Sequence, residues 1–270
     1  MSSRLFLVIQ SPKESVRDME KVLRIDTDNA IHYLKFGKGE PLVLVPSLWV
    51  TSKSYVALGR ELGKFFHVFI PDMYCGKSEF AHTATSIEDY MALLDEFIRR
   101  LHLKRYNLMG ISLSGITVTK YLLAYKHLPK KVFLVSTTVL PLNIKHQRLT
   151  LFGGYLRLLY HNMFSLDGIA SNWLWITDGL EYAWGHFRQA WTEGLIATSL
   201  EIENIKRLPV PTKLLFALRD EYVPREAVSR LLKVRNLEIE TVDRHHGWFF
   251  RREGELVAKI LDFFAGSESS

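Results

Sequence analysis

The chain has 270 residues, of which 47% are hydrophobic and 24% are charged, and its formal net charge is +6. This length and composition are ordinary for a globular protein with a substantial core, and they exclude a disordered or low-complexity chain. The single cysteine, Cys75, excludes an intramolecular disulfide and a zinc site built from cysteines.

Basic and acidic residues are mixed along the chain, and the basic runs, such as Lys130-Lys131 and Arg251-Arg252, are short. No basic stripe interleaved with aromatic residues is visible, so a nucleic-acid groove is not expected. The apolar run at residues 5–9 is too short for a signal-peptide core or a membrane span and favours a short strand. We therefore expect a cytoplasmic protein with no stable membrane insertion.

Short apolar runs rich in β-branched residues alternate with helical patterns, which predicts an α/β fold with a mostly parallel, doubly wound sheet. The predicted strands are 30–36, 42–45, 67–71, 106–109, 131–136, 213–217 and 237–242. The predicted helices are 86–101, 114–125 and 253–264. The first of these helices opens with Ser86 and Asp89, which have the spacing of a capping pair.

Residues 142–208 interrupt the alternation, because they contain no convincing strand and are dense in aromatic side chains. Four of the six tryptophans lie here: Trp173, Trp175, Trp184 and Trp191. We interpret this stretch as a helical cap inserted into a core made of residues 1–141 and 209–270. These rings either line an apolar substrate pocket or pack the small core of the cap itself.

A predicted strand runs into the sequence Gly-Ile-Ser-Leu-Ser-Gly, which ends at Gly115 and opens a helix. In a nucleophile elbow, a serine sits on such a turn between small residues, because its neighbours crowd the adjacent strand and helix. Gly110 meets this requirement, whereas Ser114 is small but is not glycine. The turn would expose the Ser112 hydroxyl and place the Leu113 N–H where it can stabilise an oxyanion. The alternative is an ordinary turn with Ser114 as a helix N-cap.

A serine nucleophile also needs a base and an acid that orients the base, and both residue types follow predicted strands further along the chain. Asp220 follows the strand 213–217, and His246 follows the strand 237–242. The order Ser, Asp, His is the one that α/β-hydrolases use.

With these motifs the chain resembles the α/β-hydrolase superfamily, specifically its cap-bearing serine esterase and lipase-like group, over residues 25–265. Residues 217–224 are similar to the family's acid-bearing G-x-x-D-x-x-V-P pattern at all positions but the glycine. Residues 245–248 resemble its histidine motif, and residues 71–78 resemble its P-D-x-x-G-x-G-x-S loop. The resemblance implies an acyl-enzyme mechanism on esters, with Ser112, Asp220 and His246 as the catalytic triad.

Two features of the predicted site leave alternatives open. His245 competes with His246, although the spacing to the final helix favours His246. The family usually has His-Gly after the strand 42–45, where this chain has Pro46-Ser47-Leu48. The oxyanion hole needs only a backbone N–H, which Leu48 would supply beside Leu113. Glu221 and Asp243 are interpreted as solvated loop charges rather than as the acid.

The aromatic residues favour a small hydrophobic ester as the substrate, and the pocket candidates are Trp49, Trp248, Trp173, Trp175 and Trp184. The same fold and triad also serve C–C bond hydrolases, lactonases, thioesterases and acyltransferases. The departures at Pro46-Ser47 and Ser114 instead favour a hydrolase-like binding protein with weak or no activity. No metal-ligand spacing and no phosphate-binding loop is present, so no metal and no cofactor is expected. The sequence does not determine whether the chain is a monomer or a homodimer.

Overall fold

The computed structural model describes residues 16–47, 50–137, 177–182, 184–185, 188–189, 205–220, 223 and 225–265. The strands are β1 (Glu20–Arg24), β2 (Ala30–Phe36), β3 (Glu40–Val45), β4 (Phe66–Pro71), β5 (Asn107–Ile111), β6 (Val132–Val135), β7 (Arg207–Ala217) and β8 (Arg235–Val242). The helices are α1 (Val16–Met19), the 3-10 helix η1 (Ser52–Tyr55), α2 (Val56–Leu62), α3 (Ile87–Arg100), α4 (Ser114–Ala124), α8 (Arg225–Ser229), the 3-10 helix η2 (Arg230–Lys233) and α9 (Glu253–Ala265).

Within the described residues, eight strands form one sheet in the order β1-β2-β4-β3-β5-β6-β7-β8. β1 and β2 run antiparallel to their neighbours, and the pairs from β4 to β8 are parallel. The carboxyl ends of the parallel strands therefore meet at one edge, which is where ligands bind in open α/β sheets. The predicted fold class is confirmed.

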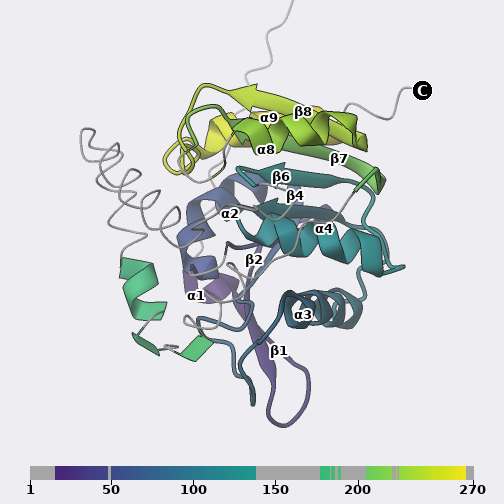
Figure 1. Ribbon diagram of the computed structural model, residues 1–270. Coiled ribbons are helices and arrows are strands. Elements are labelled where there is room, and N and C mark those ends of the chain that lie inside the picture. The colour runs from purple at the N-terminus through teal and green to yellow at the C-terminus, as the bar shows by residue number, and fades with distance from the viewer. Residues whose placement is uncertain are drawn as a thin grey trace, which may run out of the picture.

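The core has two layers, one on each face of the sheet (Figure 1). Val43 and Val45 of β3 pack with residues of α3 and α4, whereas Leu42 and Leu44 pack with residues of α2 and α9. Successive side chains of a strand point to opposite faces, so strands covered on both sides are apolar throughout. This is why the central strands are readable from sequence as continuous apolar runs.

The seven predicted strands are all present, with ends shifted by a few residues at most sites. β7 is the exception, because it begins at Arg207, six residues before the predicted start. Pro209 and Pro211 lie just before the predicted start, and proline cannot donate to a ladder. Both occupy exposed positions of β7, where the register with β8 shifts between Arg207 and Thr212. β1 was not predicted, because its charged and largely exposed residues carry no apolar pattern.

The predicted helix at 86–101 is confirmed as α3, and Ser86 and Asp89 form the expected capping box. The other two predicted helices correspond to α4 and α9. The strand expected at residues 5–9 lies outside the described residues, as does most of the predicted cap at 142–208. The boundaries of the cap therefore stay a prediction.

In the described part of the chain, no helix combines the length and the apolar character that crossing a bilayer requires.

Candidate active site

Ser112 occupies a sharp turn between the end of β5 and the start of α4. Its φ angle is 56°, a left-handed conformation that a residue other than glycine adopts only when the surrounding structure enforces it. The turn is held because the Ser112 N–H donates to the Val135 carbonyl of β6 at 2.9 Å, and the Gly115 N–H donates to the Ser112 carbonyl at 3.0 Å. This is the strained strand-turn-helix geometry of a nucleophile elbow.

Two glycines allow the helix to approach the sheet closely at this turn. A Cβ atom on Gly110 would lie 3.1 Å from the Cα of Gly115. A Cβ atom on Gly115 would lie 2.3 Å from the Oγ1 of Thr137, which is closer than any real contact. The crowding is therefore greatest at Gly115, one position beyond the last residue of the G-x-S-x-G pattern.

Ser114, which stands where the family pattern has glycine, is fully buried and takes part in the turn. Its hydroxyl accepts the Ile111 N–H at 2.8 Å and lies 2.8 Å from the Val45 carbonyl and 2.9 Å from the Ile111 carbonyl. One side chain thus ties the first turn of α4 to the ends of both β5 and β3. The departure from glycine is accommodated by these hydrogen bonds.

Among the three predicted triad residues, His246 lies within hydrogen-bond distance of both Ser112 and Asp220. The Nε2 of His246 is 2.9 Å from the Ser112 Oγ, and its Nδ1 is 2.7 Å from the Asp220 Oδ2. The side chains of His246 and Asp220 are buried, whereas Ser112 is partly accessible. The carboxylate also accepts the Val223 N–H on its other oxygen at 2.8 Å, so its orientation is fixed from two directions.

The loops after β7 and β8 bring Asp220 and His246 together. The Leu218 N–H donates to the Val242 carbonyl at 2.8 Å, and the Arg219 N–H donates to the Arg244 carbonyl at 2.9 Å. The ladder between the two strands thus continues past their ends. The residues that follow it leave the sheet side by side, which places the acid next to the histidine.

The structure separates the competing residues of the prediction. His246, rather than His245, faces Ser112 and Asp220. Asp243 points to solvent and forms a bidentate ion pair with Arg219, at 2.6 and 2.5 Å. The Arg219 guanidinium holds the pKa of the Asp243 carboxyl below its ordinary value. Glu221 lies outside the described residues.

The oxyanion side of the site is described in part. Leu113 is the N-cap of α4, so its N–H lies at the helix start as predicted. On the β3 side Pro46 has no N–H, and the Ser47 N–H is occupied by the Tyr55 hydroxyl at 3.2 Å. Burial raises the pKa of Tyr55, which remains a neutral phenol. Leu48 lies outside the described residues, and its N–H stays the predicted second donor.

The tryptophans predicted to line the pocket fall into three groups. Trp184 is 93% exposed, so the prediction for this residue is wrong, because a ring surrounded by solvent encloses nothing. Trp248 is buried beside the candidate histidine and meets the Phe249 ring edge to face, as part of the core layer under α2 and α9. Trp49, Trp173 and Trp175 lie outside the described residues, and their roles stay predictions.

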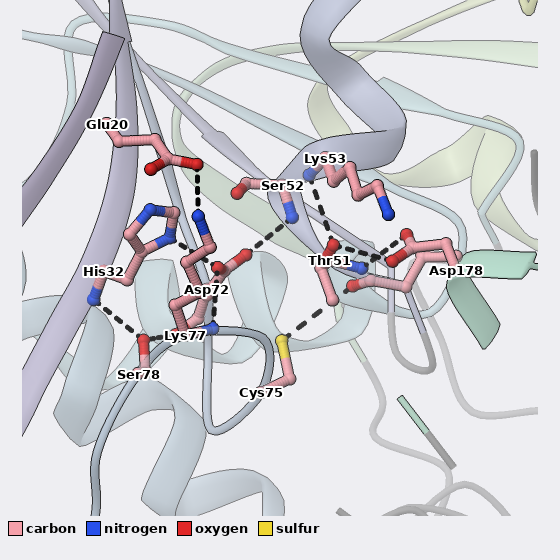
Figure 2. A network of polar contacts seen from close by, with 11 residues as sticks. Glu20, His32, Thr51, Ser52, Lys53, Asp72, Cys75, Lys77, Ser78 and Asp178 are labelled. Carbon is pink, nitrogen blue, oxygen red and sulfur yellow. Dashed lines mark hydrogen bonds and ion pairs between the residues drawn. The ribbon is translucent and has the colours of Figure 1, made fainter. Parts of the chain in front are cut away.

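A buried polar network beside the site was not anticipated from the sequence (Figure 2). Asp72, which follows β4, accepts the His32 Nδ1 at 2.7 Å and the Ser52 N–H at 2.6 Å. Asp178, from the helical residues 177–182, accepts the Thr51 N–H and hydroxyl. Asp178 and Thr51 are 127 residues apart, so no local pattern could have revealed the pair.

In the described part of the chain, no group of three or more His, Cys, Asp or Glu side chains is arranged to hold a metal ion.

The comparisons with known proteins concern the fold. A family model described as "alpha/beta hydrolase fold" matches residues 40–170. The (E)-2-((N-methylformamido)methylene)succinate hydrolase of Acinetobacter baylyi is 28% identical over 102 residues, which are 37% of this chain and 39% of that protein. The match thus spans well under half the length of that relative.

Solved structures of the same fold superpose over most of the chain. A thermophilic esterase from Thermogutta terrifontis has a TM-score of 0.71 at 14% identity, covering 92% of this chain and 98% of that one. The 2-hydroxy-6-oxo-6-phenylhexa-2,4-dienoate hydrolase from Rhodococcus sp. strain RHA1 has a TM-score of 0.72 at 17% identity, with 91% and 98% covered. At these identities the likeness concerns the fold. The family model and the solved structures together show that the chain has the α/β-hydrolase fold.

Proposed function

We propose that this chain is a serine hydrolase that cleaves hydrophobic carboxylic esters through Ser112, His246 and Asp220. The observation that carries the proposal is the pair of contacts at His246, 2.9 Å to the Ser112 Oγ and 2.7 Å to the Asp220 Oδ2. A nucleophile, its base and the group that orients the base are recognised by this geometry, whatever the fold.

The hydrogen bond to Asp220 assigns the proton of the neutral imidazole to Nδ1, which leaves Nε2 as the acceptor. As the Ser112 Oγ forms its bond to the ester carbonyl carbon, Nε2 takes the hydroxyl proton. The imidazolium then gives that proton to the departing alkoxide, and an acyl-enzyme remains. Water activated by His246 releases the acid and regenerates the hydroxyl. Asp220 stabilises the imidazolium throughout.

In this proposal the tetrahedral oxyanion is stabilised by the N–H groups of Leu113 and Leu48. Loss of one such donor typically costs about 3 kcal/mol of transition-state stabilisation, or 10²–10³ in rate. The predicted cap at 142–208 would cover the apolar part of the substrate. The natural acyl length is left to the substrate series below.

A non-catalytic binding protein was the main alternative from another functional class, motivated by Ser114 and by Pro46-Ser47. Two observations favour the enzyme. Ser114 is accommodated by hydrogen bonds that hold the turn, and the triad contacts are intact. Some of the similar proteins are hydrolases of other substrates. The second candidate function is therefore the same triad acting on a C–C bond, a lactone, a thioester or an acyl-transfer substrate.

The test is labelling with a fluorophosphonate probe together with hydrolysis of p-nitrophenyl esters of increasing acyl length. We expect wild type to be labelled at Ser112 and to hydrolyse the esters, and Ser112→Ala to lose both. Ser136→Ala is the matched control, because Ser136 also follows a parallel strand and also has a positive φ of 47°, one strand away. Labelling that persists in Ser112→Ala, or its absence in folded wild type, would rule the proposal out.

A reaction on another bond would give a different result in the same experiment. Wild type would then be labelled at Ser112 and yet hydrolyse the ester series poorly. A panel of thioesters, lactones and β-diketone-type substrates would identify the bond that is cleaved.

A further inference from the structure

We infer that Asp178 is a positioning residue for the proposed hydrolysis: from the predicted cap, its carboxylate fixes the start of η1 and thereby the loop that carries the oxyanion donor beside Ser47. The inference rests on the proposed function. Asp178 does not touch the triad in this structure, and it acts through the loop between β3 and η1.

The Asp178 carboxylate is only 1% exposed, and its described partners all lie in this loop or in η1. Its Oδ2 accepts the Thr51 N–H at 3.0 Å and the Ser54 hydroxyl at 2.5 Å, and its Oδ1 accepts the Thr51 hydroxyl at 2.8 Å. A buried carboxylate is stable only where such donors replace water. Breaking this contact would leave the Asp178 carboxylate and its donors on Thr51 and Ser54 without hydrogen-bond partners in a buried position.

The same loop is held from the opposite side by Asp72, as Figure 2 shows. Asp72 accepts the N–H of Ser52, the residue after Thr51, and is itself fixed by the His32 ring. The first N–H groups of a helix have no partners within the helix, so external acceptors determine where the helix starts. Two buried carboxylates thus fix two consecutive residues at the start of η1.

The position of η1 is transmitted to the oxyanion side through its last residue. The Tyr55 hydroxyl accepts the Ser47 N–H at 3.2 Å, and Tyr55 is fully buried. Leu48, the predicted second oxyanion donor, follows Ser47 directly in the chain. A shift of η1 would therefore move Ser47, the residue that precedes the predicted donor.

Two other contacts of the same segment separate this role from general attachment of the cap. Gln189 is 3% exposed, accepts the Ala84 N–H at 2.8 Å and donates to the Tyr90 hydroxyl at 2.9 Å, at the start of α3. Like Asp178, Gln189 is a buried polar side chain with short hydrogen bonds to the core, but it does not contact the loop between β3 and η1. Glu181 pairs with Lys53 at 2.7 Å, but both side chains are exposed, so water screens the pair.

The expected effects follow from these contacts. Displacing a transition-state donor by about 1 Å costs on the order of 10²-fold in rate, so Asp178→Ala should lower kcat about 10–100-fold with little change in KM. Asp178→Asn should stay within about threefold of wild type. Its remaining oxygen can still accept from Thr51 and Ser54, and its amide can donate to the Thr51 hydroxyl. Ser54→Ala removes one of the donors to the Asp178 carboxylate without changing any residue of the predicted cap. It should lower kcat by several-fold.

The experiment measures kcat and KM for p-nitrophenyl ester hydrolysis in wild type and in the Asp178→Ala, Asp178→Asn, Ser54→Ala and Gln189→Ala variants. Hydrogen exchange of peptides covering residues 47–55 is followed in the same proteins. We expect loss of kcat and faster exchange of this loop in Asp178→Ala, rescue in Asp178→Asn, and wild-type kcat and loop exchange in Gln189→Ala. If Asp178→Ala does not fold, Ser54→Ala supplies the comparison.

The inference is overturned if kcat is unchanged in Asp178→Ala and Ser54→Ala, or if Gln189→Ala lowers kcat as much as Asp178→Ala does. It is also overturned if Asp178→Asn falls as far as Asp178→Ala. Failure of the proposed function looks different, because wild type would then be no more active than Ser112→Ala. In that case hydrogen exchange still tests whether Asp178 holds the loop. Exchange of residues 47–55 that is the same in Asp178→Ala as in wild type would overturn this contact role, and faster exchange in Asp178→Ala would support it.

Discussion

The Oγ of Ser114 lies 2.8 Å from the carbonyl oxygen of Val45, so the first residue of α4 is joined directly to the last residue of β3. Both residues border the candidate site. Ser114 is two positions after the candidate nucleophile, and Val45 precedes the loop with the predicted oxyanion donor. The residue that departs from the family pattern therefore connects α4 to the strand that precedes the predicted second oxyanion donor.

Replacing Ser114 by glycine would complete the G-x-S-x-G pattern, and we expect this change to destabilise the protein. It leaves the buried Ile111 N–H without its acceptor, which costs about 1–3 kcal/mol. The measurement is the free energy of unfolding in urea. Ser114→Ala is the control, since it removes the same hydroxyl and keeps the Cβ atom. Equal or greater stability of Ser114→Gly would contradict the role given to this hydroxyl.

Gly115→Ala tests the close approach of α4 to the end of β6. The added Cβ atom would lie 2.3 Å from the Thr137 Oγ1, so the helix must move or strain, at about 1–3 kcal/mol. We expect lower stability and slower fluorophosphonate labelling of Ser112. Thr137→Gly removes the three atoms nearest to the added Cβ, so the cost of Gly115→Ala should shrink in that background. Additive effects of the two changes would show that the contact does not limit this site.

Asp220→Asn tests the orienting role of the acid. The amide can present an N–H to the histidine, which favours the wrong imidazole tautomer, and we expect kcat to fall about 10³–10⁴-fold with folding retained. Asp243→Asn is the matched control: a nearby aspartate whose carboxylate is exposed and paired with Arg219. Its kcat should equal that of wild type. Comparable losses in the two variants would argue that charge near the site, and not orientation, is responsible.

Asp89 provides a test of pH-dependent stability. Partial burial raises the pKa of this carboxyl, but hydrogen bonds from Thr85 and Ser86 outweigh burial and lower the pKa below its ordinary value. A group with a lowered pKa in the folded state stabilises the protein above the unfolded-state pKa and loses that contribution as the pH falls through the folded-state pKa. Wild type should therefore exceed Asp89→Asn by about 1 kcal/mol near neutral pH.

The difference between wild type and Asp89→Asn should shrink as the pH falls below about 4, the ordinary range of an aspartate. The free energy of unfolding of both proteins, measured across pH 7 to 3, gives this difference directly. A difference that is constant over this range would show that the carboxylate charge does not contribute to the helix cap.

Several elements were predictable because the forces that form them act over a few residues. Strands buried on both faces must be apolar throughout, so β2 to β6 appear in the sequence as short apolar runs. The capping box at Ser86 and Asp89 depends on a spacing of three residues, and the turn at Ser112 depends on its immediate neighbours. The order of serine, aspartate and histidine at successive strand ends could likewise be read directly.

By itself, then, the sequence determined the α/β layering, the sharp turn at Ser112 and the two strand ends that carry Asp220 and His246. Only the tertiary structure decided that His246 rather than His245 faces the serine, that Ser114 joins α4 to β3, and that Asp178 accepts hydrogen bonds from Thr51. The physical reason is distance along the chain. Hydrophobic periodicity and capping act between close neighbours, whereas these contacts join segments that folding alone brings together.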